Sequence, residues 1–335
     1  MHTQKAQTSP GPIKILGLNQ LARLVSLDKN VLLTIAETAP DYYNSFDRFK
    51  KIDQNGIERW RHIDNPTLAL KEVQDRITRK ILKPLSFGLP KYLVGGMPGR
   101  SVLTNAYPHI GKQAIVEMDL EKCFETISHN VIYRVWRSLG YGRDVSNILT
   151  KLTTLQNRLP QGSPASTILC NLALADMAQE INLIAEANDC TFTLYVDDIA
   201  LSGDEKNVVP IMSSVIAQVT KNHLKVNGKK TEIIHANKSQ AVTGVLTNRR
   251  QTVSEKKYQE IRKGIIELSK EENAINVRRL KSIWSKIHHV VYIDPTKGKL
   301  LVTLANSKLK DIKTFEGPKL KTVRTRNCKS IRNKH

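Results

Sequence analysis

Two apolar stretches that run into acidic residues are the most distinctive feature of the hydrophobic pattern. Residues 192–203 read Phe-Thr-Leu-Tyr-Val, then Asp197 and Asp198, then Ile-Ala-Leu-Ser-Gly. β-favouring residues on both sides of two adjacent charges predict a strand, a tight turn and a returning strand. Residues 113–120 form a second apolar stretch, which reaches the acid Asp119 near its end. We expect this stretch to pair beside the hairpin, so that three carboxylates surround one point.

Apolar residues recur at helical spacing over most of the remaining chain. Apolar positions three and four residues apart predict amphipathic helices that bury one face. The pattern favours an α+β fold, in which the acids stand on an antiparallel sheet and helices lie before, within and after it. Helices are expected at residues 17–38, 67–86, 128–151 (with a stop at 140–142), 165–188 and 207–226, and two more within 254–290.

Residues 42–66 predict a separate hairpin. They are basic and contain Asn55-Gly56, and Asn-Gly between β-favouring stretches is a strong hairpin signal. A ribbon with Arg61 on one face and Trp60 on the other suits a lid over a triphosphate. A solvated basic hairpin fits the same residues equally well.

The charge balance points to a polyanionic partner. The 335 residues include 52 Lys and Arg against 31 Asp and Glu, which gives a net charge of +21. Such a surplus favours nucleic acid, because neutralising phosphates supplies much of the binding free energy. From residue 297 on, twelve Lys and Arg stand against Asp311 and Glu316. The tail beyond about residue 316 is therefore expected to be disordered until RNA orders it.

Cysteine usage and the N-terminus predict a cytoplasmic protein. The four cysteines are scattered and form no Cys-x-x-Cys or Cys/His cluster, so neither zinc nor disulfides are expected. The N-terminus lacks the apolar core of a signal peptide, and no apolar run is long enough to span a bilayer. We therefore expect no membrane partner.

The three predicted carboxylates suggest metal-dependent chemistry. Oxygen ligands on a rigid frame suit hard divalent cations. Two such ions about 3.5–4 Å apart support phosphoryl transfer, because one activates the attacking hydroxyl and the other stabilises the leaving group. Taken alone, adjacent aspartates in a hairpin are also explained by ordinary turn chemistry.

The order of motifs resembles the palm of reverse transcriptases. A loop that reads Leu-Pro-Gln-Gly-Ser-Pro at residues 159–164 lies between the Asp119 strand and the Tyr-Val-Asp-Asp hairpin. The resemblance implies a right-hand polymerase fold with fingers, an antiparallel-sheet palm and a helical thumb. The expected parts are an N-terminal helical extension (1–41), fingers with part of the palm (42–112), palm (113–247), thumb (248–316) and basic tail (317–335).

The resemblance also implies roles for individual side chains. The enzyme would use two Mg²⁺ ions, with Mn²⁺ as a substitute, and deoxynucleoside triphosphates. Phe124, five residues after Asp119, would exclude a 2′-hydroxyl, since a flat ring leaves no space for an extra oxygen. The other expected roles are metal binding and catalysis by Asp119, Asp197 and Asp198, contact with the nucleotide by Gln161 and Gly162, triphosphate binding by Arg61 and Lys112, and proton donation to pyrophosphate by Lys230, with Lys229 as the alternative.

Two further motifs are similar to those of retron reverse transcriptases, a bacterial family that copies its own structured RNA. Asn105-Ala-x-x-His109 ends ten residues before Asp119, and Val242-Thr243-Gly244 follows the turn that contains Lys229 and Lys230. In the family these regions help engage the cognate RNA. The outer faces of the thumb helices are basic and suit a duplex. Expected RNA-binding residues are Asn105, His109, Val242, Thr243, Gly244, Arg278, Arg279 and Lys281.

A retron enzyme would synthesise a branched, RNA-linked single-stranded DNA, called msDNA, on a cognate structured non-coding RNA. Such systems act in antiphage defence, usually with a separate effector protein. Three alternatives remain: a group II intron-like maturase, a defence reverse transcriptase that needs no retron RNA, and a non-catalytic RNA-binding scaffold. The sequence gives no indication of an oligomeric state.

Overall fold

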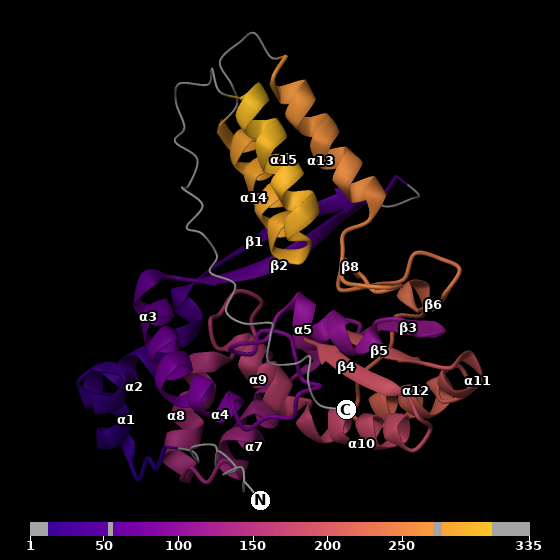
Figure 1. Ribbon diagram of the computed structural model, residues 1–335. Coiled ribbons are helices and arrows are strands. Elements are labelled where there is room, and N and C mark those ends of the chain that lie inside the picture. Colours follow the sequence, from indigo (N-terminus) through magenta and orange to yellow (C-terminus); the bar gives the residue numbers. More distant parts are fainter. Residues whose placement is uncertain (1–12, 53–55, 271–276, 310–335) are drawn as a thin grey trace, which may run out of the picture. The chain divides into compact units, whose positions relative to one another are not determined.

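The computed structural model describes residues 13–52, 56–270 and 277–309 and divides into two compact units (Figure 1). Unit 1 comprises residues 1–251 and unit 2 residues 252–335. The expected N-terminal extension, fingers and palm fall in unit 1, and most of the expected thumb falls in unit 2. The expected basic tail at 317–335 lies outside the described residues.

A four-stranded antiparallel sheet lies at the centre of unit 1, in the strand order β4-β5-β3-β6. Strand β3 is central, and its run of Ala114, Ile115, Val116 and Met118 is buried. This explains why the strand reads as an almost continuous apolar run rather than an alternating one. The predicted hairpin and its pairing with the upstream strand are confirmed. The strands are β3 (Ala114–Asp119), β4 (Thr191–Tyr195), β5 (Asp198–Gly203) and β6 (Glu232–His235).

Helices pack against this sheet as the apolar spacing predicts, but two of the expected helices are interrupted. The stretch 165–188 breaks at Leu174, and the stretch 207–226 breaks near Pro210. A proline lacks the N–H that would continue a helix, which accounts for the second break. These helices are α6 (Cys123–Thr126), α7 (His129–Ser138), α8 (Arg143–Thr153), α9 (Ser166–Ala173), α10 (Ala175–Glu186), α11 (Glu205–Val208) and α12 (Met212–Lys221).

Within the described ranges, no single helix is long and apolar enough to cross a membrane. Helices α9 and α10 reach the required length and composition only as a pair bent by 55°. Apolar side chains such as Leu169 and Ile181 of this pair lie in the hydrophobic core of unit 1.

The N-terminal helices are held by cations at a helix end. Arg76 donates to the carbonyl of Val25 at 2.7 Å, and Lys80 donates to that of Leu24 at 2.7 Å. Both carbonyls close the C-terminal end of α1, where positive charge is favourable. The expected helix at 67–86 contains one π-helical segment. The elements are α1 (Leu18–Leu24), α2 (Lys29–Glu37), the 3₁₀ turn η1 (Ala39–Tyr42), α3 (Leu68–Ile77), the π-helical η2 (Thr78–Leu82) and α4 (Lys83–Ser86).

Two hairpins complete unit 1. Strands β1 (Tyr43–Ile52) and β2 (Glu58–Pro66) form the predicted basic ribbon, although residues 53–55 of its turn lie outside the described residues. A short hairpin carries the Val-Thr-Gly motif, with Thr243 at φ +49° and Gly244 at φ +77°. Two consecutive positive φ values match the twist of a two-residue hairpin loop. The remaining elements are α5 (Val102–Ala106), the 3₁₀ turns η3 (Tyr107–His109) and η4 (Gly228–Lys230), β7 (Ala241–Val242) and β8 (Val245–Leu246).

The described residues of unit 2, 252–270 and 277–309, form a bundle of three helices. Apolar side chains including Ile265, Ile287, Val290 and Leu301 form its interior. The third helix was not predicted: Asp294 accepts a hydrogen bond from the Lys297 N–H, and proline occupies the first helical position. The helices are α13 (Glu255–Leu268), α14 (Val277–Ile293) and α15 (Pro295–Lys308).

Candidate active site

The three predicted carboxylates meet at one end of the sheet. Asp119 ends β3 and lies directly opposite Asp198, the first residue of β5. Asp197 occupies the turn before β5, and its carbonyl accepts the Leu120 N–H at 2.8 Å. Val196 precedes it at φ +62°, which is unusual for a β-branched residue and marks a strained turn. The sheet therefore fixes the aspartates from two separate segments.

Negative charge at this point is poorly compensated. Burial raises the pKa of Asp197, and the nearby Asp119 raises it further. Burial, together with Asp197 and Asp119, raises the pKa of Asp198 from 3.8 to about 6. Lys230 forms an ion pair with one of the three, because its Nζ lies 2.6 Å from Asp119 Oδ1.

The three carboxylates supply the oxygen ligands that divalent cations prefer. In the described part of the chain, no three Asp, Glu, His or Cys side chains stand in coordination geometry around one point. The Lys230 ammonium already contacts one Asp119 oxygen, so that carboxylate is shared with a lysine. A bound cation would neutralise the charge that raises the pKa of Asp197 and Asp198. Asp119, Asp197 and Asp198 are the residues that would hold it.

The raised pKa of Asp198 predicts a pH dependence of stability. Its pKa is about 6 in the folded protein and near 3.8 when exposed, so its ionisation disfavours folding. Without divalent ions, the contribution of Asp198 to the free energy of unfolding should therefore increase as pH falls from about 7 towards 4, and it should decrease as pH rises through 6. Thermal unfolding of wild type and Asp198→Asn across this range measures the effect. A difference between the two proteins that does not change with pH would contradict it.

A neighbouring loop holds the catalytic turn from outside the sheet. A Cβ on Gly95 would lie 2.4 Å from the Val196 nitrogen, so only glycine permits this approach. The buried Asn171 donates to the Gly95 carbonyl at 2.9 Å. Arg100 donates to the carbonyl of Leu89 at 2.6 Å and also to those of Pro90 and Leu93. Sequence reasoning treated this segment as a simple loop and missed its contact with the turn.

The basic hairpin brings positive charge to the same place. Arg61 lowers the pKa of Asp197, and Lys50 lowers that of Asp198, against the larger effect of burial. The charge of Arg61 thus acts on the aspartates, and its contact with a triphosphate remains a prediction. Gln161 and Gly162 contact the base of the hairpin, and Phe124 packs half-buried against the core directly after the Asp119 strand.

Lys112 is not part of this site, which corrects its predicted role in triphosphate binding. It precedes Ala114, which lies at the far end of β3 from Asp119. A six-residue strand spans roughly 17 Å, too far for a lysine side chain to cross. Burial lowers the pKa of His109, and the charge of Lys112 lowers it further; burial raises the pKa of Cys190, and Lys112 opposes that rise.

Burial also corrects the expected RNA contacts of three motif residues, Asn105, His109 and Val242. The His109 ring nitrogens lie 2.6 Å from Ser202 Oγ and 2.8 Å from Thr193 Oγ1. Burial lowers the pKa of His109 to about 3, so the ring is neutral. His109 thus supports the central sheet, and none of these three buried side chains can touch RNA from the interior.

The two retron-like motifs nevertheless meet. Asn105 Nδ2 donates to Thr243 Oγ1 at 3.4 Å, across 138 residues of sequence. Gly244, beside Thr243, is exposed at the tip of the hairpin. Thr243 and Gly244 thus remain available for contact with RNA, while Asn105 sets the position of their turn.

Glu117 is a site residue that sequence reasoning missed. Burial, Asp198 and Glu232 raise its pKa to about 7, while a hydrogen bond from the Thr243 backbone opposes the rise. It precedes Asp119 by two positions, so strand alternation places both on one face. That spacing is the signal that could have identified it.

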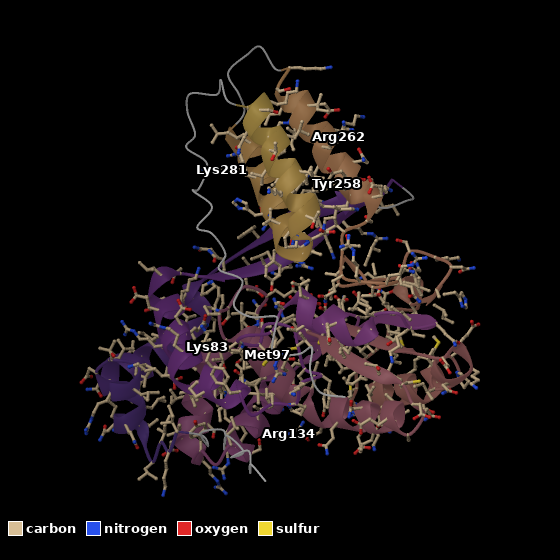
Figure 2. All side chains as sticks on the ribbon, in the orientation of Figure 1. Lys83, Met97, Arg134, Tyr258, Arg262 and Lys281 are labelled. Atoms are coloured by element: carbon tan, nitrogen blue, oxygen red, sulfur yellow. The ribbon has the colours of Figure 1, made fainter. Side chains whose placement is uncertain are left out.

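The predicted basic residues of unit 2 are accessible. Arg278, Arg279 and Lys281 lie at the start of α14 and are exposed, whereas Leu280 between them is buried. Figure 2 shows Lys281, and Arg262 on α13, projecting from their helices. Their contact with RNA remains a prediction.

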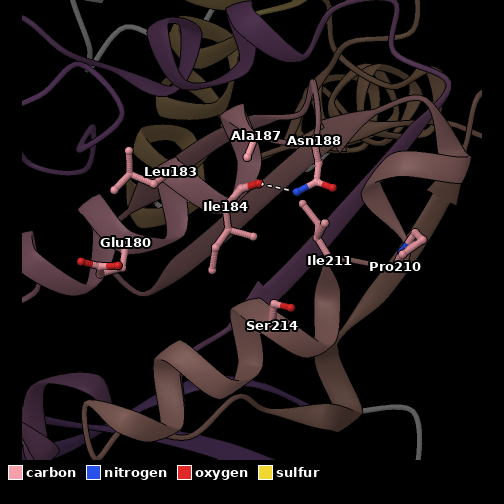
Figure 3. A pocket seen from close by; sticks show the side chains of 8 residues that line it. All are labelled: Glu180, Leu183, Ile184, Ala187, Asn188, Pro210, Ile211 and Ser214. Atoms are coloured by element: carbon pink, nitrogen blue, oxygen red, sulfur yellow. Dashed lines mark hydrogen bonds between the residues drawn. The ribbon is translucent and has the colours of Figure 1, made fainter.

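An open pocket elsewhere in unit 1 contains none of the predicted site residues. It lies between α10 and the segment that leads into α12, and is lined in part by Leu183, Ile184, Pro210 and Ile211 (Figure 3). The three predicted carboxylates lie elsewhere, where the end of β3 meets the start of β5.

The chain is similar to several known proteins. Residues 50–262 match the family model described as reverse transcriptase (RNA-dependent DNA polymerase). The retron Ec86 reverse transcriptase of Escherichia coli is 32% identical over 75% of this chain and 79% of its own length. The retron Se72 reverse transcriptase of Salmonella heidelberg is 26% identical over 69% of this chain and 62% of its own length. A solved telomerase from Candida tropicalis is similar with a TM-score of 0.45 and 14% identity over 67% of this chain and 59% of that chain.

Proposed function

The chain belongs to the retron-type reverse transcriptases, which are RNA-directed DNA polymerases, and on that premise we propose that it copies a cognate structured non-coding RNA into msDNA. The observation that carries the proposal is the arrangement of the Asp119, Asp197 and Asp198 segments, combined with the direct contact between Asn105 and Thr243. The first supports a polymerase site, and the second links the buried Asn105 of one retron-like motif to the accessible Thr243 turn of the other.

In the proposed reaction, a hydroxyl on the growing end attacks the α-phosphate of a deoxynucleoside triphosphate and pyrophosphate leaves. Two Mg²⁺ ions on Asp119, Asp197 and Asp198 would supply activation of the hydroxyl and stabilisation of the leaving group. Arg61 binds the triphosphate from the hairpin, and Phe124 blocks a 2′-hydroxyl. Lys230, once its ammonium leaves Asp119, is within the site to protonate pyrophosphate.

Replacing Phe124 by Val should relax sugar selection. A smaller side chain leaves space for one hydroxyl, and pocket contacts of this size discriminate by roughly 10–200-fold. We expect the ratio of kcat/KM values for dNTP over rNTP to fall by tens-fold while dNTP incorporation continues. Single-nucleotide extension with matched dNTP and rNTP measures the ratio. An unchanged ratio would mean that Phe124 is ordinary core.

Replacing Lys230 by Met should lower kcat by about 10²-fold, the usual contribution of a positioned general acid. Lys229→Met is the matched control, since Lys229 lies one position away in the same 3₁₀ turn. Single-turnover extension separates the chemical step from binding. Equal losses in both variants, or a loss only in Lys229→Met, would reject the assignment.

The proposed setting is the bacterial cytoplasm, with the RNA, its DNA product and a separate effector protein in antiphage defence. The test is to express the gene with its flanking DNA, and to analyse the copurifying nucleic acid on a denaturing gel after RNase treatment. A discrete DNA that shortens with RNase, keeps a residual ribonucleotide, and is absent from Asp197→Ala/Asp198→Ala supports a retron. Heterogeneous DNA without an RNA branch would indicate a defence polymerase of another lineage, and DNA-independent function in the double variant would indicate a scaffold.

A further inference from the structure

A buried ion pair joins the basic hairpin to the body of unit 1. Asp64, near the end of β2, is fully buried. Arg158 Nη1 donates to Asp64 Oδ2 at 2.6 Å, and Nη2 donates to Oδ1 at 3.3 Å. The two residues are 94 positions apart in sequence, and Arg158 lies three residues before Gln161. The pair therefore links the strand that carries Arg61 to the loop expected to contact the nucleotide.

Further contacts fill the remaining acceptor positions of Asp64. Ser45 Oγ donates to Oδ1 at 2.8 Å, and His62 Nε2 lies 3.2 Å from the same oxygen. The other His62 ring nitrogen lies 2.9 Å from Asp47. Ser45 and Asp47 are the direct cross-strand partners of Asp64 and His62. Asp64 is thus fixed by both strands of the hairpin and by Arg158.

The backbone adds a second connection between the same two segments. The Asp64 N–H donates to the Gln161 carbonyl at 2.8 Å. Gly162 has φ +141°, and a Cβ there would lie 2.5 Å from the Asp64 carbonyl oxygen. No side chain separates the loop from the hairpin at this point, so a small movement of one segment displaces the other.

We infer that Asp64 and Arg158 are positioning residues that hold the hairpin against the Gln161–Gly162 loop. They thereby set the position at which Arg61 contacts the incoming triphosphate. The inference rests on the proposed polymerase function. Register and strand alternation place Arg61, paired with Arg48, on the hairpin face opposite the one that carries Asp64. An apolar pair of similar volume would often be at least as stable as a buried ion pair. The bidentate geometry therefore favours a role in orientation.

The test compares steady-state nucleotide incorporation in Asp64→Asn, Arg158→Met and the double variant on a fixed primer–template. In these variants Arg61 should be displaced with the hairpin, while Asp119, Asp197 and Asp198 stay in place. The KM for dNTP should therefore rise about tenfold or more, while kcat changes less than about threefold. The double variant should be no worse than the worse single variant, because both changes remove one interaction. Glu37→Gln is the control, since it breaks the exposed pair with Lys151 elsewhere in unit 1.

Arg158→Lys and hydrogen exchange distinguish a loss of positioning from a loss of folding. Lysine keeps the positive charge but cannot make the bidentate contact, so the KM of Arg158→Lys should lie between those of wild type and Arg158→Met. Amides of β1 and β2 should exchange faster in Asp64→Asn, while those of β3 and β5 keep their protection. Unchanged KM and unchanged hairpin exchange in an active enzyme would overturn the inference, as would additive losses in the double variant. A wild-type protein that synthesises no DNA would instead overturn the proposed function.

Discussion

Asp197→Asn should abolish DNA synthesis, by about 10³-fold or more, and leave the fold intact. Metal-assisted phosphoryl transfer supplies several kcal/mol of transition-state stabilisation, and each 1.4 kcal/mol is about tenfold in rate. The substitution keeps the shape of the side chain and removes one of the three charges that would hold the ions. The neutral side chain also removes a repulsive, partly buried carboxylate, so the metal-free variant should unfold at an equal or higher temperature than wild type.

Primer extension and thermal unfolding together distinguish this result from misfolding. Mg²⁺ should raise the unfolding temperature of wild type, because a ligand that binds only the native state stabilises it, and should raise that of Asp197→Asn much less. Asp176→Asn, an exposed change on α10, is the matched control and should behave as wild type. Normal synthesis by Asp197→Asn would remove the three-carboxylate site from the mechanism.

The sequence predicted three of the four strands of the sheet and the meeting of the acids, because both depend on local pattern; strand β6 was not predicted. A strand ending in Asp119 and a hairpin carrying Asp197 and Asp198 can pair in few ways, so the meeting of the acids followed from the pattern of β-favouring residues. Helix α15 lies within the expected thumb but was not predicted, although Asp294 followed by proline is a helix-start signal.

Long-range contacts explain what the sequence could not show. Lys112 is near Asp119 in sequence, but the extended strand between them carries the two to opposite ends of the sheet. The sequence alone does not show whether His109 faces RNA or the interior. Its hydrogen bonds with Thr193 and Ser202, which are distant in sequence, place it in the interior. Likewise, no periodicity relates Asp64 to Arg158, because their pairing depends on how the hairpin folds onto unit 1.

Gly95→Ala should reduce kcat by about 10²-fold or more while primer–template binding stays near the wild-type value. The added Cβ would fall 2.4 Å from the Val196 nitrogen and 2.7 Å from the Tyr195 carbonyl carbon. These are backbone atoms, which cannot rotate away as a side chain could, so the Val196 turn must move. Displacements of about 1 Å at a reacting centre can cost roughly 10²-fold in rate.

Gly142→Ala is the matched control for this prediction, because nothing lies within 4 Å of a Cβ at that position. The two variants should differ in kcat, measured by single-turnover extension, although both add one methyl group. Asn171 donates to the Gly95 carbonyl from α9, so Asn171→Ala should weaken the same support and lower kcat in the same direction. Full activity in Gly95→Ala would mean that the loop tolerates displacement and that the β4–β5 pairing alone fixes the catalytic turn. A loss confined to primer–template binding would move the role of this loop from the aspartates to the nucleic acid.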